Sequence, residues 1–310
     1  MDGESYIIRN YCPADFETYL RLQVESEQLE SSGRFISARG LSDYLERPNF
    51  ASQKDLFVAE FNGALVGYLS TTLEPGIQRA LLDGLVHPLH RRKGIATELF
   101  TRGLQRVNES GINAAQVSVL ETNASARGFL NHLGFTFIRY FFKLRLDINR
   151  VQLPAARRGP TTSRRLKPGE KDLLTELQNR CFIDTWGFNP NTPEEIAYRL
   201  NMHGRSPEDV ILTYLKDKPV GYCWIIINPE ENAKREKNKG LIHMLGVDPG
   251  YRKQEIGKAI LLNGIEELQD KSVDIVELTV DSENPAACAL YESVGFEVSA
   301  KTEWYEKAVT

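Results

Sequence analysis

Apolar and polar positions divide the chain into short strands and amphipathic helices. Residues 55–72, DLFVAEFNGALVGYLSTT, are two β-rich runs joined by an Asn-Gly pair, which is typical of a tight hairpin turn. Residues 275–296, IVELTVDSENPAACALYESVGF, are typical of a strand followed by a helix. Asn284 is the expected N-cap, Pro285 the first helical residue, and Gly295 the residue that ends the helix. Helices that alternate with strands in this way predict an α/β protein.

The same pattern occurs twice in the sequence. At an offset of 161 the two copies align over about 50 residues without a gap; matched pairs are Val86 with Val247, Arg91 with Arg252, Ile95 with Ile256, Asn123 with Asn284, Gly134 with Gly295, and Phe135 with Phe296. Upstream, residues 57–69 resemble residues 211–223 at an offset of 154 to 155. The second copy therefore contains an insertion, which we place in the polar run 228–240, where a hairpin loop is expected.

Two copies in 310 residues predict two domains. We expect residues 1–150 to form the first domain and residues 164–310 the second. The segment between them, 151–163, lies in a stretch with two prolines, a basic cluster and no hydrophobic period, so it is expected to be a linker.

Composition and charge narrow the class of protein. A hydrophobic content of 41% and a charged content of 26% are typical of a soluble globular protein. The net charge of −4 argues against nucleic acid as a partner, and no apolar run approaches the roughly 20 residues of a membrane helix. The N-terminus has no signal pattern, and the scattered cysteines show no metal-ligand spacing, so a cytoplasmic protein without a metal is expected. Nothing here indicates an oligomeric state.

Two loops, one in each copy, have a sequence pattern that suits the binding of a phosphate group. Each follows a strand that ends in Val-x-Pro and has the form Arg-x-x-Gly-x-Gly/Ala before a helix: VHPLHRRKGIA at 86–96 and VDPGYRKQEIG at 247–257. A tight turn into a helix N-terminus presents free backbone N–H groups and the positive end of the helix dipole, which suits a pyrophosphate. An ordinary strand–turn–helix with surface cations is the alternative for either loop alone.

Together with NPAACALYESVGF at 284–296, these loops resemble the GCN5-related N-acetyltransferase (GNAT) family. The resemblance covers nearly the whole chain, once per half, and the tandem layout is distantly similar to that of the mycothiol synthases in this family. It implies two tandem domains, each with a central mixed, mostly antiparallel sheet flanked by helices. It also implies acetyl-CoA as co-substrate, bound by Val86, Arg91, Arg92, Lys93, Gly94, Ile95 and Ala96 in the first copy and by Val247, Arg252, Lys253, Gln254, Glu255, Ile256, Gly257, Lys258 and Asn284 in the second.

Glu255 departs from the family pattern, because it stands where the first copy has Gly94. A carboxylate about 5 Å from a phosphate would cost roughly 3 kcal/mol at an effective dielectric constant near 20. The loop acts through main-chain N–H groups, however, and Glu255 can turn its side chain to solvent if its φ is not positive. We therefore expect weaker CoA binding in the second half than in the first.

The resemblance also indicates which half holds the catalytic groups. Family members commonly use a tyrosine of the last helix to protonate the leaving thiolate, and that position is Tyr291, against Leu130 in the first copy. A packed core tyrosine is the alternative. For the base, strand alternation places Leu241, His243, Leu245 and Val247 on one face, and the family often has a histidine or glutamate four or six residues before the valine.

His243 stands four residues before Val247, and its match at the offset of 161 is Leu82. Leu241 stands six before, where mycothiol synthase-like sequences carry glutamate, which counts against that substrate. A histidine satisfied by a core neighbour is the alternative for His243. On this basis the first half lacks both candidate groups.

The segment 181–195 of the second copy is expected to contact the acceptor. Phe182, Trp186 and Phe188 would line a pocket for an apolar or ring-bearing amine, or else anchor the loop on the core. The sequence thus predicts an acetyl-CoA-dependent N-acetyltransferase that acts on an amine of a small molecule or peptide by direct attack on the thioester. Two alternatives stay open: a CoA-binding scaffold without turnover, and transfer to oxygen or of a longer acyl group.

Overall fold

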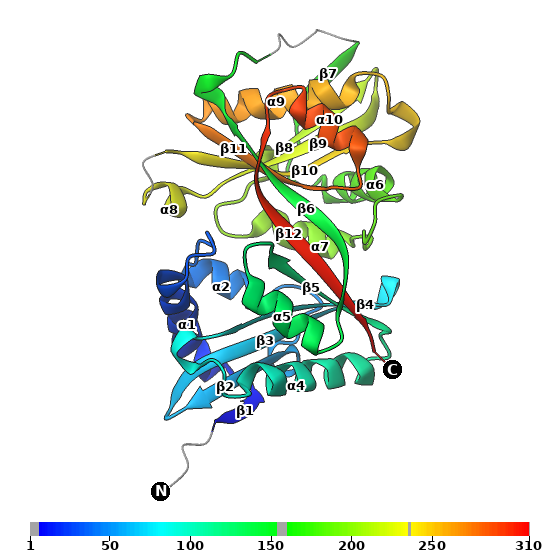
Figure 1. The fold of residues 1–310 in the computed structure, drawn as a ribbon. Coiled ribbons are helices and arrows are strands. Elements are labelled where there is room, and N and C mark those ends of the chain that lie inside the picture. The colour runs from blue at the N-terminus through cyan, green and yellow to red at the C-terminus, as the bar shows by residue number, and fades with distance from the viewer. Residues whose placement is uncertain (1–5, 154–159, 235–236, 310) are drawn as a thin grey trace, which may run out of the picture. The chain divides into compact units, whose positions relative to one another are not determined.

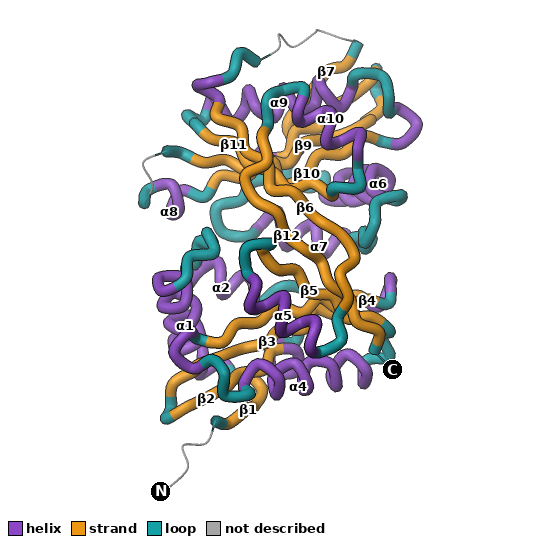
Figure 2. Tube along the Cα trace, viewed as in Figure 1, coloured by secondary structure: helices purple, strands orange, loops and turns teal. Residues whose placement is uncertain are grey.

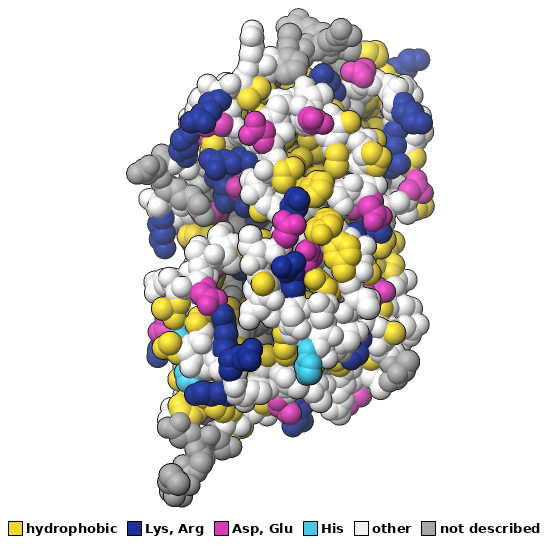
Figure 3. Space-filling model, in the orientation of Figure 1, with side chains coloured by type: hydrophobic (Ala, Val, Ile, Leu, Met, Phe, Trp, Pro, Cys, Tyr) yellow, Lys and Arg dark blue, Asp and Glu magenta, His cyan; other side chains and the backbone are white. Residues whose placement is uncertain are grey.

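The computed structural model describes residues 6–153, 160–234 and 237–309. The chain forms two compact units, an N-terminal unit of residues 1–138 and 303–310 and a C-terminal unit of residues 139–302 (Figure 1). None of the helices in the described part of the chain is long and apolar enough to cross a membrane. Basic and acidic side chains are interspersed on the face drawn in Figure 3, in keeping with the small net charge.

The N-terminal unit is a mixed sheet between two helical layers. Its strand order is β1, β2, β3, β4, β5 and the end of β12, and β4 and β5 are parallel while the pairs from β1 to β4 are antiparallel. The helices α1 and α2 pack on one face, and α4 and α5 pack on the other. The strands are β1 (Ile7–Asn10), β2 (Leu56–Phe61), β3 (Ala64–Glu74), β4 (Arg79–Val86) and β5 (Ala114–Leu120); the helices are α1 (Phe16–Leu29), α2 (Ala38–Leu45), α3 (Ser52–Asp55), α4 (Ile95–Glu109) and α5 (Ala124–His132).

The C-terminal unit repeats this arrangement. Its strand order is β6, β11, β10, β9, β8 and β7, with β10 and β11 parallel. The helices α6 and α7 pack on one face, and α9 and α10 pack on the other. The strands are β6 (Thr136–Asp147), β7 (Thr161–Arg165), β8 (Val210–Leu215), β9 (Lys218–Ile227), β10 (Lys239–Val247), β11 (Ile275–Asp281) and β12 (Glu297–Ala308); the helices are α6 (Lys171–Phe182), α7 (Pro193–Asn201), α8 (Pro229–Asn232), α9 (Ile256–Asp270) and α10 (Pro285–Glu292).

The last strands of the two copies are exchanged, and β6 and β12 lie side by side in Figures 1 and 2. Strand β6 belongs to the first copy in sequence but pairs antiparallel with β11, from Asp147 opposite Ile275 to Phe141 opposite Asp281. The end of β12 instead completes the N-terminal unit, where Tyr305 is buried in the core. The compact units therefore differ from the expected domains 1–150 and 164–310 at these strands.

The expected local signals are found where the pattern placed them. The β2–β3 turn has Asn62 and Gly63 at φ values of 50° and 78°, as a tight hairpin of this type requires. Asn284 caps α10 by accepting a hydrogen bond from the Ala287 N–H, and Gly295 lies at φ 101° beyond its end. Strand β7 begins inside the expected linker 151–163, of which residues 154–159 lie outside the described residues, as do 235–236 of the run 228–240.

Candidate acetyl-transfer site

In each unit the two parallel strands separate before the loop that resembles a pyrophosphate site. Strands β4 and β5 are paired only as far as Leu82 opposite Val117, and β10 and β11 only as far as Leu241 opposite Glu277. Beyond these points β4 and β10 continue along their antiparallel neighbours alone. The ends of both strands therefore have one open edge that leads to the loop.

The two loops have the same backbone. A 3-10 turn after the strand is followed by Arg91 at φ −70°, ψ 167° or Arg252 at φ −68°, ψ 164°. Arg92 and Lys253 are left-handed, with φ values of 63° and 59°. Successive N–H groups of such a turn, placed before a helix N-terminus, can make a concave anion site, here at the start of α4 or α9. This geometry suits an anion such as a diphosphate in both units.

The loop arginines brace the turn with their side chains. The Nε atoms of Arg91 and Arg252 donate to the carbonyls of Val86 and Val247 at 3.0 and 3.2 Å. Arg252 also donates to the carbonyl oxygen of Cys181 at 2.8 Å. These guanidinium groups therefore stabilise the loop. We expect the two arginines to contribute to anion binding mainly by holding the main chain in shape.

Other predicted loop residues differ in what their side chains contact. Lys93 donates to the Tyr6 hydroxyl at 2.8 Å, so it is engaged within the N-terminal unit. Lys253 is exposed, Lys258 half-buried, and neither amino group bonds another residue of the described chain. The remaining loop residues are Gln254, exposed at the loop tip, Ile95 and Ile256, buried in the two cores, and Ala96 and Gly257, half-buried in the first turns of the helices.

Glu255 has a positive φ, whereas the expected solvent exposure of its side chain assumed that its φ is not positive. It is left-handed at φ 61°, ψ 0°, beside φ 80°, ψ −7° for Gly94. A non-glycine residue in this region is strained by about 1 kcal/mol, partly offset by the carboxylate at the positive end of α9. The side chain is nevertheless exposed and makes no capping hydrogen bond, so the main-chain N–H groups stay available.

A β-bulge at His243 overturns the predicted strand faces. Ile242 pairs with Ile225 and Met244 with Trp224, so His243 is an extra residue in β10. Because the bulge shifts the alternation, Leu241 and Met244 pack toward α6 and α7, whereas Leu245 and Val247 pack toward α9 and α10. The expectation that Leu241, His243, Leu245 and Val247 share one face was therefore wrong.

The bulge also corrects the alignment of the two copies. Strand pairing sets Ile227 against Leu73 at an offset of 154, Gly240 against Ala80 at 160, and Val247 against Val86 at 161. Six inserted residues thus lie between β9 and β10, near the expected run 228–240, and the seventh is the bulge. Leu82 corresponds to Ile242, and His243 has no counterpart in the first copy.

His243 lies on the α6 and α7 face at the point where β10 leaves β11. Its ring packs edge-on to Trp224, with 5.5 Å between the ring centroids. The residue as a whole keeps accessible surface, yet burial of its imidazole, together with the positive charges of Arg205 and Arg199, lowers its pKa to about 4. It is therefore neutral at pH 7 and has a free lone pair, as a proton acceptor needs, but it is a weak base.

Tyr291 lies in α10 on the opposite layer. It is buried in the core against Phe296, with the ring centroids 5.8 Å apart, and burial raises the pKa of its hydroxyl. A phenol in this state stays protonated and can donate a proton. Its counterpart Leu130 is buried in the N-terminal core and has no proton to give.

The aromatic residues of segment 181–195 contact one another and their own unit. Phe182 stacks on Phe188 with centroids 5.5 Å apart and meets Tyr222 edge-on at 6.5 Å. Trp186 packs under the guanidinium of Arg139 at 4.0 Å. All three predicted aromatic residues are half-buried, and Phe182 belongs to the margin of the core beneath α6 and α7.

Sequence reasoning missed Asp83 in the first copy. Strand β4 has no bulge, so Leu82 packs toward α4 and α5 and Asp83 lies on the α1 and α2 face, directly after the last β5 pair. Its carboxylate accepts from Arg34 at 3.0 Å and from the Tyr68 hydroxyl at 2.9 Å. At the fixed offset of 161 Leu82 matches His243, and a bulge cannot be read from that alignment.

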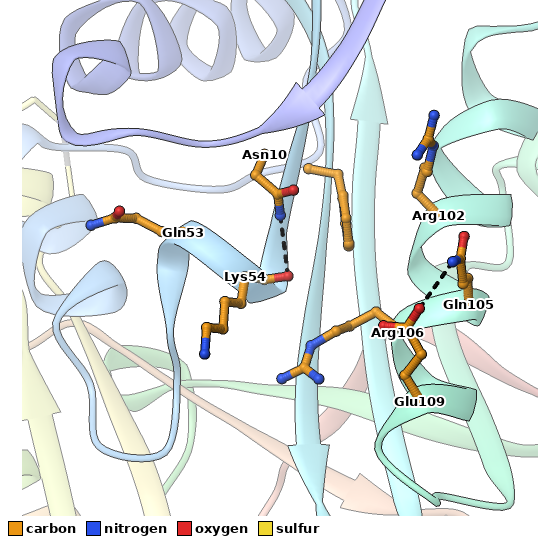
Figure 4. A pocket seen from close by; sticks show the side chains of 8 residues that line it. Asn10, Gln53, Lys54, Arg102, Gln105, Arg106 and Glu109 are labelled. Atoms are coloured by element: carbon orange, nitrogen blue, oxygen red, sulfur yellow. Dashed lines mark hydrogen bonds between the residues drawn. The ribbon is translucent and has the colours of Figure 1, made fainter.

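A pocket of about 300 Å³ lies on the N-terminal unit, away from its loop. Figure 4 shows Lys54, Arg102, Arg106 and Glu109 around it, from α3 and the last turns of α4. Arg106 is bound to Asp55 at 2.9 Å. The loop 91–96 lies at the N-terminus of α4, so this pocket is separate from that loop. No group of three or more potential metal ligands occurs in the described part of the chain.

Comparison with known proteins identifies the family. The profile of the acetyltransferase (GNAT) family matches residues 21–135 and again residues 171–296. The chain belongs to the GNAT family. It is a tandem member and an N-acetyltransferase, and its two domains have the GNAT fold, as predicted. GNAT enzymes use acetyl-CoA as donor.

Similar proteins include two mycothiol acetyltransferases and a tandem GNAT protein of known structure. A mycothiol acetyltransferase of Sanguibacter keddieii is 27% identical over 229 residues, covering 72% of this chain and 71% of the relative. Another, of Segniliparus rotundus, is 25% identical and covers 84% of this chain and 96% of the relative. A tandem GNAT protein of the clavulanic acid biosynthesis pathway has the same fold, with a TM-score of 0.74, 18% identity and 99% of both chains covered.

Proposed function

We propose that the C-terminal unit of this GNAT protein transfers acetyl groups to an amine of a small molecule or peptide. The observation that carries the proposal is the bulge in β10, which the otherwise similar β4 lacks. The bulge interrupts the ladder to β9 beside the strand split, where His243 lies on the α6 and α7 face. A candidate proton acceptor then lies at the place where the parallel strands part, beside a ladder that the bulge disrupts locally.

The residues of the C-terminal unit would divide the work as follows. Residues 252–257 hold the diphosphate, and acetyl-CoA supplies a thioester that the amine attacks directly. A backbone N–H near the bulge stabilises the developing oxyanion, His243 accepts the amine proton directly or through water, and Tyr291 protonates the departing thiolate. Asn284 contributes by starting α10 and so setting the position of Tyr291.

We assign a different role to the first copy, residues 1–150. Its loop 91–96 has glycine at the left-handed position, so it would hold CoA, but β4 is regular and Leu130 replaces the tyrosine. It is therefore a degenerate copy that binds without turnover. The named relatives are mycothiol acetyltransferases, and Leu241 stands where mycothiol synthase-like sequences are expected to carry glutamate, so we do not extend their acceptor to this chain.

The proposal is tested by measuring the release of free CoA from acetyl-CoA in the presence of a panel of primary amines. Amine-dependent release by the wild-type chain, reduced in His243→Ala and Tyr291→Phe, supports the proposal. Acetyl-CoA binding without release by any amine favours the second candidate, a CoA-binding scaffold, for which the strained Glu255 is the specific observation.

A further inference from the structure

Three polar side chains in the C-terminal unit are buried without hydrogen-bond partners. The Tyr222 hydroxyl, the Trp224 indole N–H and both amide atoms of Gln178 contact no donor or acceptor in the described chain. The three residues are at most 1% exposed. An unpaired buried polar group destabilises a fold by roughly 1–3 kcal/mol, so three in one place call for a partner that arrives from outside.

These groups share the face that carries His243. Tyr222 and Trp224 are neighbours of Gly246 and Met244 across the β9–β10 ladder. Gln178 lies on α6 one turn from Leu174 and Cys181, which pack in the same core as Tyr222 and Trp224. The unpaired atoms therefore lie between α6 and the strand that holds the candidate base.

Arg199 adds an unpaired charge to this face. Its half-buried side chain, on α7, makes no hydrogen bond or ion pair with another residue of the described chain. Its positive charge acts on both Tyr222 and His243. A guanidinium held there favours an anionic group close to the reacting amine.

In the first copy the equivalent tyrosine has a hydrogen-bond partner. Tyr68 is the counterpart of Tyr222, and its hydroxyl donates to the Asp83 carboxylate at 2.9 Å. Asp83 corresponds to Met244 in the second copy, at an offset of 161. The exchange of carboxylate for thioether removes the internal partner and leaves the Tyr222 hydroxyl unpaired.

We propose that Tyr222, Trp224, Gln178 and Arg199 recognise the acceptor, which is an amine that also carries a carboxylate or phosphate and further hydrogen-bonding groups. The proposal rests on the acetyl transfer assigned to this unit. Because these side chains are buried and the Phe182 ring packs edge-on against Tyr222, we expect Phe182 to move aside when the acceptor binds.

The first test needs no substrate and compares Tyr222→Phe with Tyr68→Phe. Loss of an unpaired hydroxyl should leave the melting temperature unchanged or raise it by about 2–4 °C, whereas Tyr68→Phe should lower it because the carboxylate of Asp83 loses a donor. A fall in Tyr222→Phe as large as that in Tyr68→Phe would show an internal partner and overturn the proposal.

The second test uses matched amines: glycine with glycinamide, and O-phosphoethanolamine with ethanolamine. Ligand-observed NMR measures binding independently of turnover. Tighter binding of the acidic member of one pair identifies the anion, and Arg199→Met should abolish that preference. In turnover, Tyr222→Phe should raise the acceptor KM about tenfold with little change in kcat. Equal binding within both pairs, or no binding of any member, overturns the acceptor class; preferential binding without turnover contradicts the proposed function alone.

Discussion

The pyrophosphate-type loops and the strands that precede them have diverged differently in the two units. The loops share their backbone angles although Glu255 replaces Gly94 and most side chains differ. Strands β4 and β10 differ by one inserted residue, His243, which lies on the α6 and α7 face. Binding through main-chain N–H groups tolerates sequence change, whereas catalysis depends on register.

Unlike the loops, the α1 and α2 face of the first unit and the α6 and α7 face of the second differ in their hydrogen bonding. In the N-terminal unit, Asp83, Arg34 and Tyr68 satisfy one another. In the C-terminal unit, Tyr222 and its neighbours are unpaired. A face whose polar groups are internally satisfied gains nothing from a ligand, so the comparison supports our proposal that the second copy binds the acceptor.

Deletion of His243 should have the largest effect, because it would give β10 the regular register of β4. We expect turnover to fall by at least about a thousandfold, since the proposed base and the local break in the β9–β10 ladder disappear together. His243→Ala keeps the bulge and should lose less. Steady-state release of CoA is the measurement, with circular dichroism to check folding; equal losses in the two variants would show that the bulge itself has no role.

Tyr291→Phe should lower turnover about a hundredfold and leave acetyl-CoA affinity nearly unchanged. The ring stays in the core, so packing against Phe296 is kept. Rate and calorimetric Kd are measured on the same preparation. An unchanged rate would make Tyr291 a packed core residue.

Exchange of Gly94 and Glu255 should raise acetyl-CoA affinity and stability in the second unit and lower both in the first. Glu255→Gly relieves a positive φ and a negative charge, so it should raise stability by about 1 kcal/mol and tighten acetyl-CoA binding. Gly94→Glu should do the reverse, through strain and charge, since a side chain there meets open space. Calorimetry with acetyl-CoA should resolve two sites; one site that ignores Gly94→Glu would make the first copy structural only.

The smallest effect concerns pH. The pKa of His243 is lowered from 6.5 to about 4 in the folded chain, so between these values the unfolded chain binds more protons. Its contribution to stability is therefore complete above pH 6.5 and is lost as the pH falls toward 4. NMR titration of the ring should show neutral His243 at pH 5.5; a midpoint near 6.5 would contradict the assigned environment.

The sequence predicted the repeat, the loops and the helix caps because these depend on local signals. Asn284, Pro285 and Gly295 act within a few residues of their own position. The bulge at His243, the exchange of β6 and β12, and the unpaired Tyr222 depend on partners far away in the chain. No spacing of residues reveals them, although the tyrosine shared by VGYL and VGYC was a visible sign.

The most direct test of the central claim places one carboxylate at the equivalent point of each helix, with Ala96→Asp in the first copy and Gly257→Asp in the second. Either charge should repel the diphosphate of its own site by about 3 kcal/mol at 5 Å. We predict that Gly257→Asp abolishes amine-dependent release of CoA and that Ala96→Asp retains it. Loss of turnover in Ala96→Asp with activity kept in Gly257→Asp would contradict the assignment of chemistry to the C-terminal unit.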